Sequence, residues 1–156
     1  MTQPLTAVVT RAELSHLGEL APLFDQYRQF YGRPSDLGTA RRFLTERLEN
    51  DDVVVYLARS QDAAVGFTLV YPSYSSVRAQ RIWVLNDLYV ARDARRGRVG
   101  AALLEAAVRG ALAVGVTHLS LQTARDNTAA QALYEGMGWV RDEEFCTYTL
   151  TLPGQG

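Results

Sequence analysis

An arginine-rich loop between an expected strand and an expected helix is the part of the sequence best suited to bind a charged ligand. The strand spans Leu85–Val90, and an apolar-faced helix begins after Gly97. Four arginines lie in or next to the loop, at positions 92, 95, 96 and 98. A helix start carries free backbone N–H groups and the positive end of the helix dipole, and glycines there let an anion approach closely. The sequence therefore predicts a phosphate-binding turn, with an ordinary solvated loop as the alternative.

Two common nucleotide-binding motifs are absent from this loop. It contains no Gly-Lys-Ser/Thr, which excludes a nucleotide P-loop, and no Gly-x-Gly-x-x-Gly, which excludes a dinucleotide turn. A phosphorylated cofactor of another kind is the remaining interpretation.

Length and composition limit the class of protein. The 156 residues suffice for one domain with a core, and 47% are hydrophobic, which argues against disorder. A net charge of −1 argues against a general nucleic-acid surface. No run reaches the ~20 apolar residues of a membrane helix, no signal-peptide pattern is present, and the single Cys146 cannot form a disulfide within the chain. We expect one domain, residues 1–156, in a cytoplasmic protein with no nucleic-acid, membrane or metal partner.

Hydrophobic periodicity predicts a mixed α/β fold. Strands are expected at 5–10, 53–58, 64–71, 81–90, 118–122 and 145–152, and helices around 17–31, 37–50, 99–114 and 127–137. Pro22 is expected to kink or split the first helix, Ser35 to cap the second, and residues 72–76 to form a loop. This order predicts a central sheet flanked by helices.

A second candidate site follows the strand at 118–122. Asn127 stands at an expected helix start, where its side chain can cap the helix. Tyr134 lies about two turns later, so both side chains can face the same side. From spacing alone, Tyr134 is better explained as a packing aromatic.

Together these stretches resemble the GNAT acetyltransferase superfamily, whose members transfer an acetyl group from acetyl-CoA to an amine. The family's phosphate turn, Gln/Arg-x-x-Gly-x-Gly/Ala, is matched by Arg95–Gly100, except that Arg98 replaces the first glycine and Gly97 suggests a turn shifted by one residue. The family's later motif, Asn-x-x-Ala…Tyr…Gly-Phe/Trp, is matched at positions 127, 130, 134, 138 and 139. The segments 27–31, 85–90 and 145–148 look most similar to small members near the diamine and D-amino-acid acetyltransferases.

The resemblance implies a GNAT fold, in which a mostly antiparallel sheet is splayed where acetyl-CoA binds as co-substrate. The pantetheine arm would bond to the strand backbone and the pyrophosphate to the amides of the turn. The residues expected to bind the cofactor in this way are Leu88, Tyr89, Val90, Arg95, Arg96, Gly97, Arg98, Val99, Gly100, Ala101, Asn127 and Tyr134.

The implied reaction is direct attack of a neutral amine on the thioester in a ternary complex. The backbone N–H of Leu88 would polarise the carbonyl, and Tyr134 would protonate the thiolate or hydrogen-bond to it. An alkylamine is mostly protonated at neutral pH, so a base must accept a proton. Asp87 is the first candidate and Glu144 the second, although Asp87 could instead only orient the amine and Glu144 could lie in a solvated turn.

The acceptor groove is expected to combine aromatic and polar side chains, which suit an amine cation. Its expected residues are Tyr27, Tyr31, Tyr74, Trp83, Asn86 and Asp87. The leading interpretation is an N-acetyltransferase for a small amine such as a polyamine or amino acid. A protein-lysine acetyltransferase and a non-catalytic acyl-CoA sensor are the alternatives. The final strand could pair with a second copy, giving a homodimer.

Overall fold

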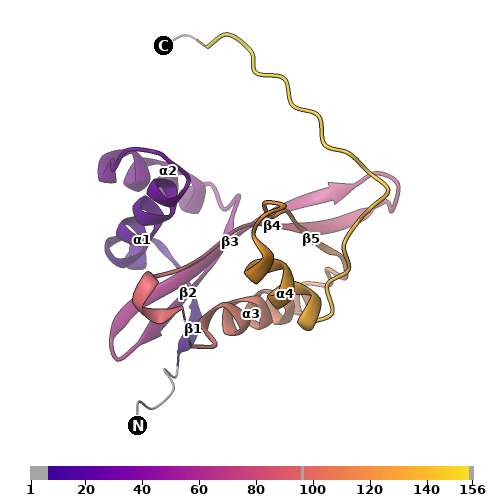
Figure 1. Cartoon of the computed structure of the whole chain (residues 1–156). Coiled ribbons are helices and arrows are strands. Elements are labelled where there is room, and N and C mark those ends of the chain that lie inside the picture. The colour runs from indigo at the N-terminus through magenta and orange to yellow at the C-terminus, as the bar shows by residue number, and fades with distance from the viewer. Residues whose placement is uncertain (1–6, 96, 155–156) are drawn as a thin grey trace. The chain divides into compact units, whose positions relative to one another are not determined.

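The computed structural model describes residues 7–95 and 97–154, which contain a five-stranded sheet and four α-helices (Figure 1). The strands are β1 (Val8–Arg11), β2 (Val54–Ser60), β3 (Ala63–Ser75), β4 (Gln80–Val90) and β5 (Leu119–Leu121). The helices are α1 (Leu17–Phe30), α2 (Leu37–Glu49), α3 (Val99–Ala113) and α4 (Thr128–Gly136), with two 3₁₀ turns, η1 (Leu14–His16) and η2 (Arg92–Ala94). The predicted mixed α/β class is confirmed.

The chain divides into two compact units, residues 1–122 and 123–156, and each is described by itself. The first unit holds the sheet with α1, α2 and α3. The second holds α4 and the C-terminal segment. The expectation that residues 1–156 form one domain stays a prediction.

The strands follow one another across the sheet in chain order, and only β4 and β5 run parallel. The hairpin between β2 and β3 turns at Gln61 and Asp62, whose positive φ angles of 52° and 63° are typical of a two-residue type I′ turn. After β4 the chain crosses over through α3 before it returns as β5, because parallel neighbours need such a connection. The sheet is therefore mostly antiparallel, as predicted.

Helices cover both faces of the sheet (Figure 1). On one face, apolar residues of α1 and α2, among them Leu20, Phe24 and Leu44, form a buried cluster with Phe67 and Leu69 of β3. On the other face α3 lies against β3, where nearly the whole helix stripe is buried. Burial on both faces fixes β3 and its neighbour β4, which carries most of the candidate site.

Gly66 of β3 lies in close contact with both α3 and β4. A Cβ at this position would lie 2.8 Å from the Tyr89 carbonyl oxygen, 3.2 Å from Leu103 Cδ1 and 3.3 Å from Val99 Cγ1. Because the closest of these atoms belongs to the backbone of β4, a side chain at Gly66 cannot be accommodated by a rotamer change alone.

We expect Gly66→Ala to lower the free energy of unfolding by about 1–3 kcal/mol in urea titration. Gly18→Ala is the matched control, since a Cβ there meets no atom within 4 Å. That change in α1 is expected to be neutral or to stabilise the protein by up to about 1 kcal/mol. An equal free energy of unfolding for Gly66→Ala and the wild type would contradict the close packing of β4 and α3 around Gly66.

Two local expectations for the helical region differ from the structure. Pro22 does not split α1, which runs unbroken from Leu17 to Phe30; the kink expected as the alternative stays a prediction. The hydrogen bond that Pro22 cannot make would end at the carbonyl of Gly18, which is exposed and can bind water instead. Ser35 does not cap α2; Asp36 does, by accepting from the Thr39 N–H at 3.0 Å, while the Ser35 hydroxyl donates to Asp25 at 2.7 Å.

Two expectations for strands were also wrong. Residues 72–75 are not a loop but the end of β3, paired with β4. Pro72 is tolerated because β2 pairs with β3 only as far as Val70, which leaves the other edge at Pro72 open. Residues 145–152 form no strand, although their alternation is real. Alternation predicts a strand only where a backbone partner exists, and these side chains, such as Tyr148 at 93% exposure, are left exposed.

Candidate active site

A β-bulge in β4 is the local feature that shapes the candidate site. Val70 pairs with Leu85 and Leu69 pairs with Asp87, so Asn86 is an extra residue in β4. The extra residue changes which side chains face which layer. Trp83 lies under α3, where its ring is 3.4 Å from the position of a Cβ on Gly110. Asp87 and Tyr89 lie on the opposite face, with Tyr27 of α1.

One edge of β4 is open beyond the bulge. The parallel pairing with β5 ends at Leu85 and Leu121, whereas β4 continues to Val90. The Ala91 N–H donates to the Val65 carbonyl at 2.7 Å, so the alternation of an antiparallel ladder turns the backbone groups of Leu88 and Val90 away from β3. In the described part of the chain, no strand pairs with this edge. An extended ligand with amide groups can add here as a strand would.

The start of α3, which follows this edge in the chain, carries backbone N–H groups that make no bond within the helix. Arg98, the N-cap residue, makes no side-chain cap hydrogen bond. The first bond of the helix runs from the Ala102 N–H to the Arg98 carbonyl at 2.9 Å, so the N–H groups of residues 99–101 have no partner within the helix. The Gly97 N–H is already bonded to the Ala94 carbonyl at 3.2 Å. Arg96 lies outside the described residues. The helix start therefore fits a pyrophosphate.

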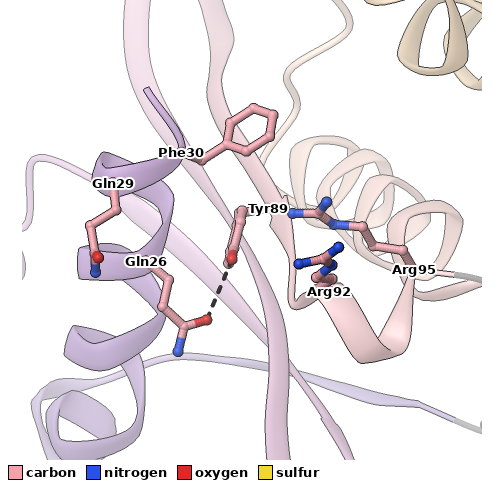
Figure 2. Close-up of a pocket in the computed structure, with 6 residues that line it drawn as sticks. All are labelled: Gln26, Gln29, Phe30, Tyr89, Arg92 and Arg95. Carbon is pink, nitrogen blue, oxygen red and sulfur yellow. Dashed lines mark hydrogen bonds between the residues drawn. The ribbon is translucent and has the colours of Figure 1, made fainter. Parts of the chain in front are cut away.

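An open cleft of about 490 Å³ lies between α1 and the end of β4, and Figure 2 shows its lining. Its residues are Gln26, Gln29, Phe30, Tyr89, Arg92 and Arg95. The Arg95 guanidinium lies over the rings of Phe30 and Tyr89, 5.5 and 5.7 Å from their centroids, and its Nε donates to the Val90 carbonyl at 3.0 Å. The lining holds two cations and no carboxylate, so the cleft favours an anionic group.

Asp87 is a buried carboxylate at the bulge, with only 5% of its surface exposed. Its side chain accepts from the Asn86 amide at 3.1 Å and from the Tyr27 hydroxyl. Burial raises the pKa of Asp87, and the hydrogen bonds from Tyr27 and Asn86 lower it in part. The same burial, together with Asp87, raises the pKa of Tyr27 strongly, so Tyr27 stays a neutral donor. A carboxylate with a raised pKa accepts a proton more readily.

The raised pKa of Asp87 has a consequence for stability. Because burial holds the pKa of Asp87 in the folded state above that of an exposed aspartate, ionised Asp87 costs stability at neutral pH. That cost disappears below the unfolded pKa, where both states are protonated. We expect Asp87→Asn to melt at a higher temperature than the wild type at neutral pH, with the gap closing as the pH falls toward about 4. A gap independent of pH in thermal melts would contradict this assignment.

The expected acceptor residues do not all lie together. Tyr27 and Tyr31 are neighbours, with ring centroids 5.1 Å apart, and Tyr27 contacts Asp87. Trp83 is under α3 on the other face. Tyr74 pairs with Arg81 near the turn of the β3–β4 hairpin, whereas Asp87 pairs with Leu69. At about 3.3 Å per residue, Tyr74 lies about 16 Å along β3 from Leu69.

Some residues around the site were not anticipated. Thr68, fully buried, donates its hydroxyl to the Asp87 carbonyl at 2.8 Å. Gln26 and Phe30 line the cleft from α1, and Tyr89 donates to Gln26 at 3.4 Å (Figure 2). Residues 26, 27 and 30 have the helical spacing of one side of α1, and this spacing is the sequence signal by which Gln26 and Phe30 were predictable. No sequence signal marks the bulge at Asn86.

The remaining candidates belong to the second unit. Asn127 caps α4, with its side-chain oxygen accepting from the Ala130 N–H at 3.2 Å, as predicted. Tyr134 is half-buried and its ring lies 6.2 Å from that of Trp139. Glu144 is exposed, and its N–H donates to the Asp142 carboxylate at 2.8 Å, which forms a short turn. Roles for these three residues remain predictions.

Within residues 7–95 and 97–154, no cluster of three or more His, Cys, Asp or Glu side chains is placed to hold a metal ion. No helix in the same part of the chain has the length and apolarity that crossing a membrane requires.

Comparison with known proteins identifies the family. The model of the acetyltransferase (GNAT) family matches residues 20–139. The uncharacterized N-acetyltransferase YhfO of Bacillus subtilis is 42% identical over 147 residues, which cover 94% of this chain and 99% of YhfO. The crystal structure of a probable acetyltransferase is 41% identical, with a TM-score of 0.87 over 95% of this chain and 99% of that one.

A more distant structure shares the fold. It is an aminoglycoside N-acetyltransferase in complex with CoA, 19% identical, with a TM-score of 0.79 over 97% of this chain and 99% of that one. The open edge of β4 and the uncapped start of α3 fit the pantetheine and pyrophosphate of such a cofactor. The chain belongs to the GNAT family and is an acetyl-CoA-dependent N-acetyltransferase.

Proposed function

We propose that this enzyme acetylates a primary amine of a small cationic molecule, such as a polyamine or an amino acid, by direct attack within a ternary complex. The observation that carries the proposal is the Asp87 carboxylate, buried beside the open edge of β4 with a raised pKa. A buried carboxylate attracts an ammonium group and can accept its proton. A slender amine reaches such a group more easily than a bulky one.

The proposed chemistry assigns one task to each group of this chain. Acetyl-CoA supplies an activated acetyl thioester. Asp87 takes the proton from the amine, directly or through water, and the N–H of Leu88 polarises the thioester carbonyl. The amine nitrogen bonds to the acetyl carbon and the carbon–sulfur bond breaks. Tyr134 then donates its proton, or a hydrogen bond, to the sulfur. The role of Tyr134 rests on its match to the family motif at residues 127–139.

The cofactor contacts are proposed on the geometry of two elements. The outward-facing backbone groups of Leu88 and Val90 suit the amides of pantetheine. The N–H groups of residues 99–101, which make no hydrogen bond within α3, suit the pyrophosphate, with Arg92 and Arg95 adding positive charge nearby. The contact of Asn127 with the cofactor arm is carried over from the family motif, and it is compatible with its capping role.

The acceptor is best identified by measuring release of free CoA thiol. The panel should hold polyamines, L- and D-amino acids, an aminoglycoside and a lysine-containing peptide at equal amine concentration. Because the sequence contains no lysine, the enzyme's own side chains add no lysine background to this assay. We expect turnover with the small amines and little turnover with the peptide. Turnover with the peptide alone would favour a protein-lysine acetyltransferase. The absence of turnover with every amine would favour a non-catalytic acyl-CoA sensor.

A resemblance to the diamine and D-amino-acid acetyltransferases remains part of the proposal, and the same panel tests it. We also propose a homodimer, in which the exposed alternating segment 145–152 pairs with a second copy. Light scattering of the full chain and of a chain ending at residue 144 compares their masses. A dimer that survives the truncation would contradict that role of the segment.

A further inference from the structure

The ring of Tyr27 is held by aromatic neighbours on several sides. It meets Phe67 edge-on, with centroids 5.7 Å apart and an interplanar angle of 85°, and Tyr89 at 6.1 Å. Tyr31 lies at 5.1 Å and Phe24 at 6.2 Å. Edge-to-face and tilted pairs at these distances are favourable and restrict the ring. The hydroxyl of Tyr27 therefore has a fixed direction.

That hydroxyl is directed to the Asp87 carboxylate. Asn86 donates to Oδ1 of the same carboxylate at 3.1 Å, and Thr68 holds the Asp87 backbone by donating to its carbonyl at 2.8 Å. Side chain and backbone of Asp87 are thus fixed from α1, from β3 and from the bulge residue itself.

The surroundings of Asp87 contain few charges. On α1, Tyr27 faces the carboxylate, and on β3 the hydroxyl of Tyr71 faces the same region. Arg47 of α2 and Asp52 act electrostatically on Tyr71. Among the described residues, Asp87 makes no salt bridge. Neutral hydrogen-bond donors, and not a cation of the protein, are what stabilises the ionised carboxylate here.

We propose that Tyr27 is a positioning residue for Asp87, fixing the carboxylate that receives the amine proton, and not a wall of the acceptor groove. This inference rests on the proposed function only for the part that concerns proton transfer. The Tyr27 ring is partly buried and packs against four aromatic rings, and its hydroxyl already interacts with Asp87. The hydroxyl is therefore occupied by Asp87, and much of the ring surface is occupied by protein contacts.

Tyr27→Phe tests this inference because it removes the hydroxyl and keeps the ring. The direct readout is a carbon-13 NMR titration of the Asp87 carboxyl, assigned by its disappearance in Asp87→Asn. Removing a donor to the ionised form raises the pKa of Asp87, so the titration midpoint should move to higher pH. Tyr71→Phe is the matched control, since it removes a nearby hydroxyl that makes no hydrogen bond to Asp87. In this variant the titration midpoint of Asp87 should stay at the wild-type position. An unchanged midpoint in Tyr27→Phe would overturn the inference.

Kinetics separate this inference from the proposed function. If Asp87 is the base, the acidic limb of kcat/KM in Tyr27→Phe should move to higher pH together with the NMR midpoint, and kcat/KM below the limb should fall roughly tenfold. A moved NMR midpoint with an unmoved kinetic limb would support the positioning of Asp87 and contradict its role as base. A higher KM at every pH with an unmoved midpoint would make Tyr27 a groove wall after all.

Discussion

Tyr134→Phe is expected to lower kcat by about 10²–10⁴-fold while acetyl-CoA affinity stays unchanged. The substitution removes one hydroxyl and little volume, and the loss of a positioned proton donor costs about this much. Steady-state rates of thiol release give kcat, and calorimetric titration with acetyl-CoA gives the affinity. Because the ring remains, its packing against Trp139 at 6.2 Å is retained.

A second tyrosine of the same unit provides the control for this experiment. Tyr148 is 93% exposed, so Tyr148→Phe should leave kcat at the wild-type value. Wild-type turnover in Tyr134→Phe would mean that Tyr134 only packs or that departure of the thiolate does not limit the rate. Equal losses in both variants would point to a general effect on the second unit.

Asp87→Asn should lower kcat/KM for amines by about 10²–10⁴-fold, with the loss in kcat if Asp87 is the base. Asparagine keeps the shape and can still accept from Tyr27, so the site should remain folded. The remaining activity should depend on pH as a free amine does and rise toward alkaline pH. If Asp87 only attracts the cation, the loss should lie mainly in KM. Rates measured over pH at saturating acetyl-CoA distinguish these two outcomes.

Asp62→Asn is the matched control for the loss of a carboxylate. Asp62 is exposed in the turn of the β2–β3 hairpin at a φ of 63°, which asparagine also adopts readily. It should not affect the rate. Wild-type kinetics of Asp87→Asn with every cationic acceptor would exclude both roles of Asp87 and transfer the assignment of the base to Glu144.

The parts of the fold that follow from local rules were predictable from the sequence. The hairpin of β2 and β3, the start of α3 after Gly97, and its end before Gly115 at a φ of 79° all reflect patterns within a few residues. The cap of α4 by Asn127 is of the same kind. The helix start at Val99 was likewise predictable, whereas phosphate binding there stays a prediction.

Features that depend on partners distant in sequence were not predictable. The bulge at Asn86 arises from the pairing of β4 with β3, and only that register separates Trp83 from Asp87 onto opposite faces. The contact of Tyr27 with Asp87 joins α1 to β4 through the packing of Phe67. The segment 145–152 shows the converse, since its alternation alone supplies no partner for its backbone.

We propose above all that the edge of β4 and the start of α3 bind acetyl-CoA. The melting temperature of the protein with and without the cofactor tests this most directly. Binding to the folded state alone adds about 2.7 kcal/mol of stability when the ligand is at about 100 times its Kd. We expect a clear rise in melting temperature with acetyl-CoA and with CoA, and a much smaller one with acetyl-pantetheine, because acetyl-pantetheine lacks the pyrophosphate that we propose residues 99–101 bind. No rise with acetyl-CoA at millimolar concentration, or an equal rise with acetyl-pantetheine, would contradict it.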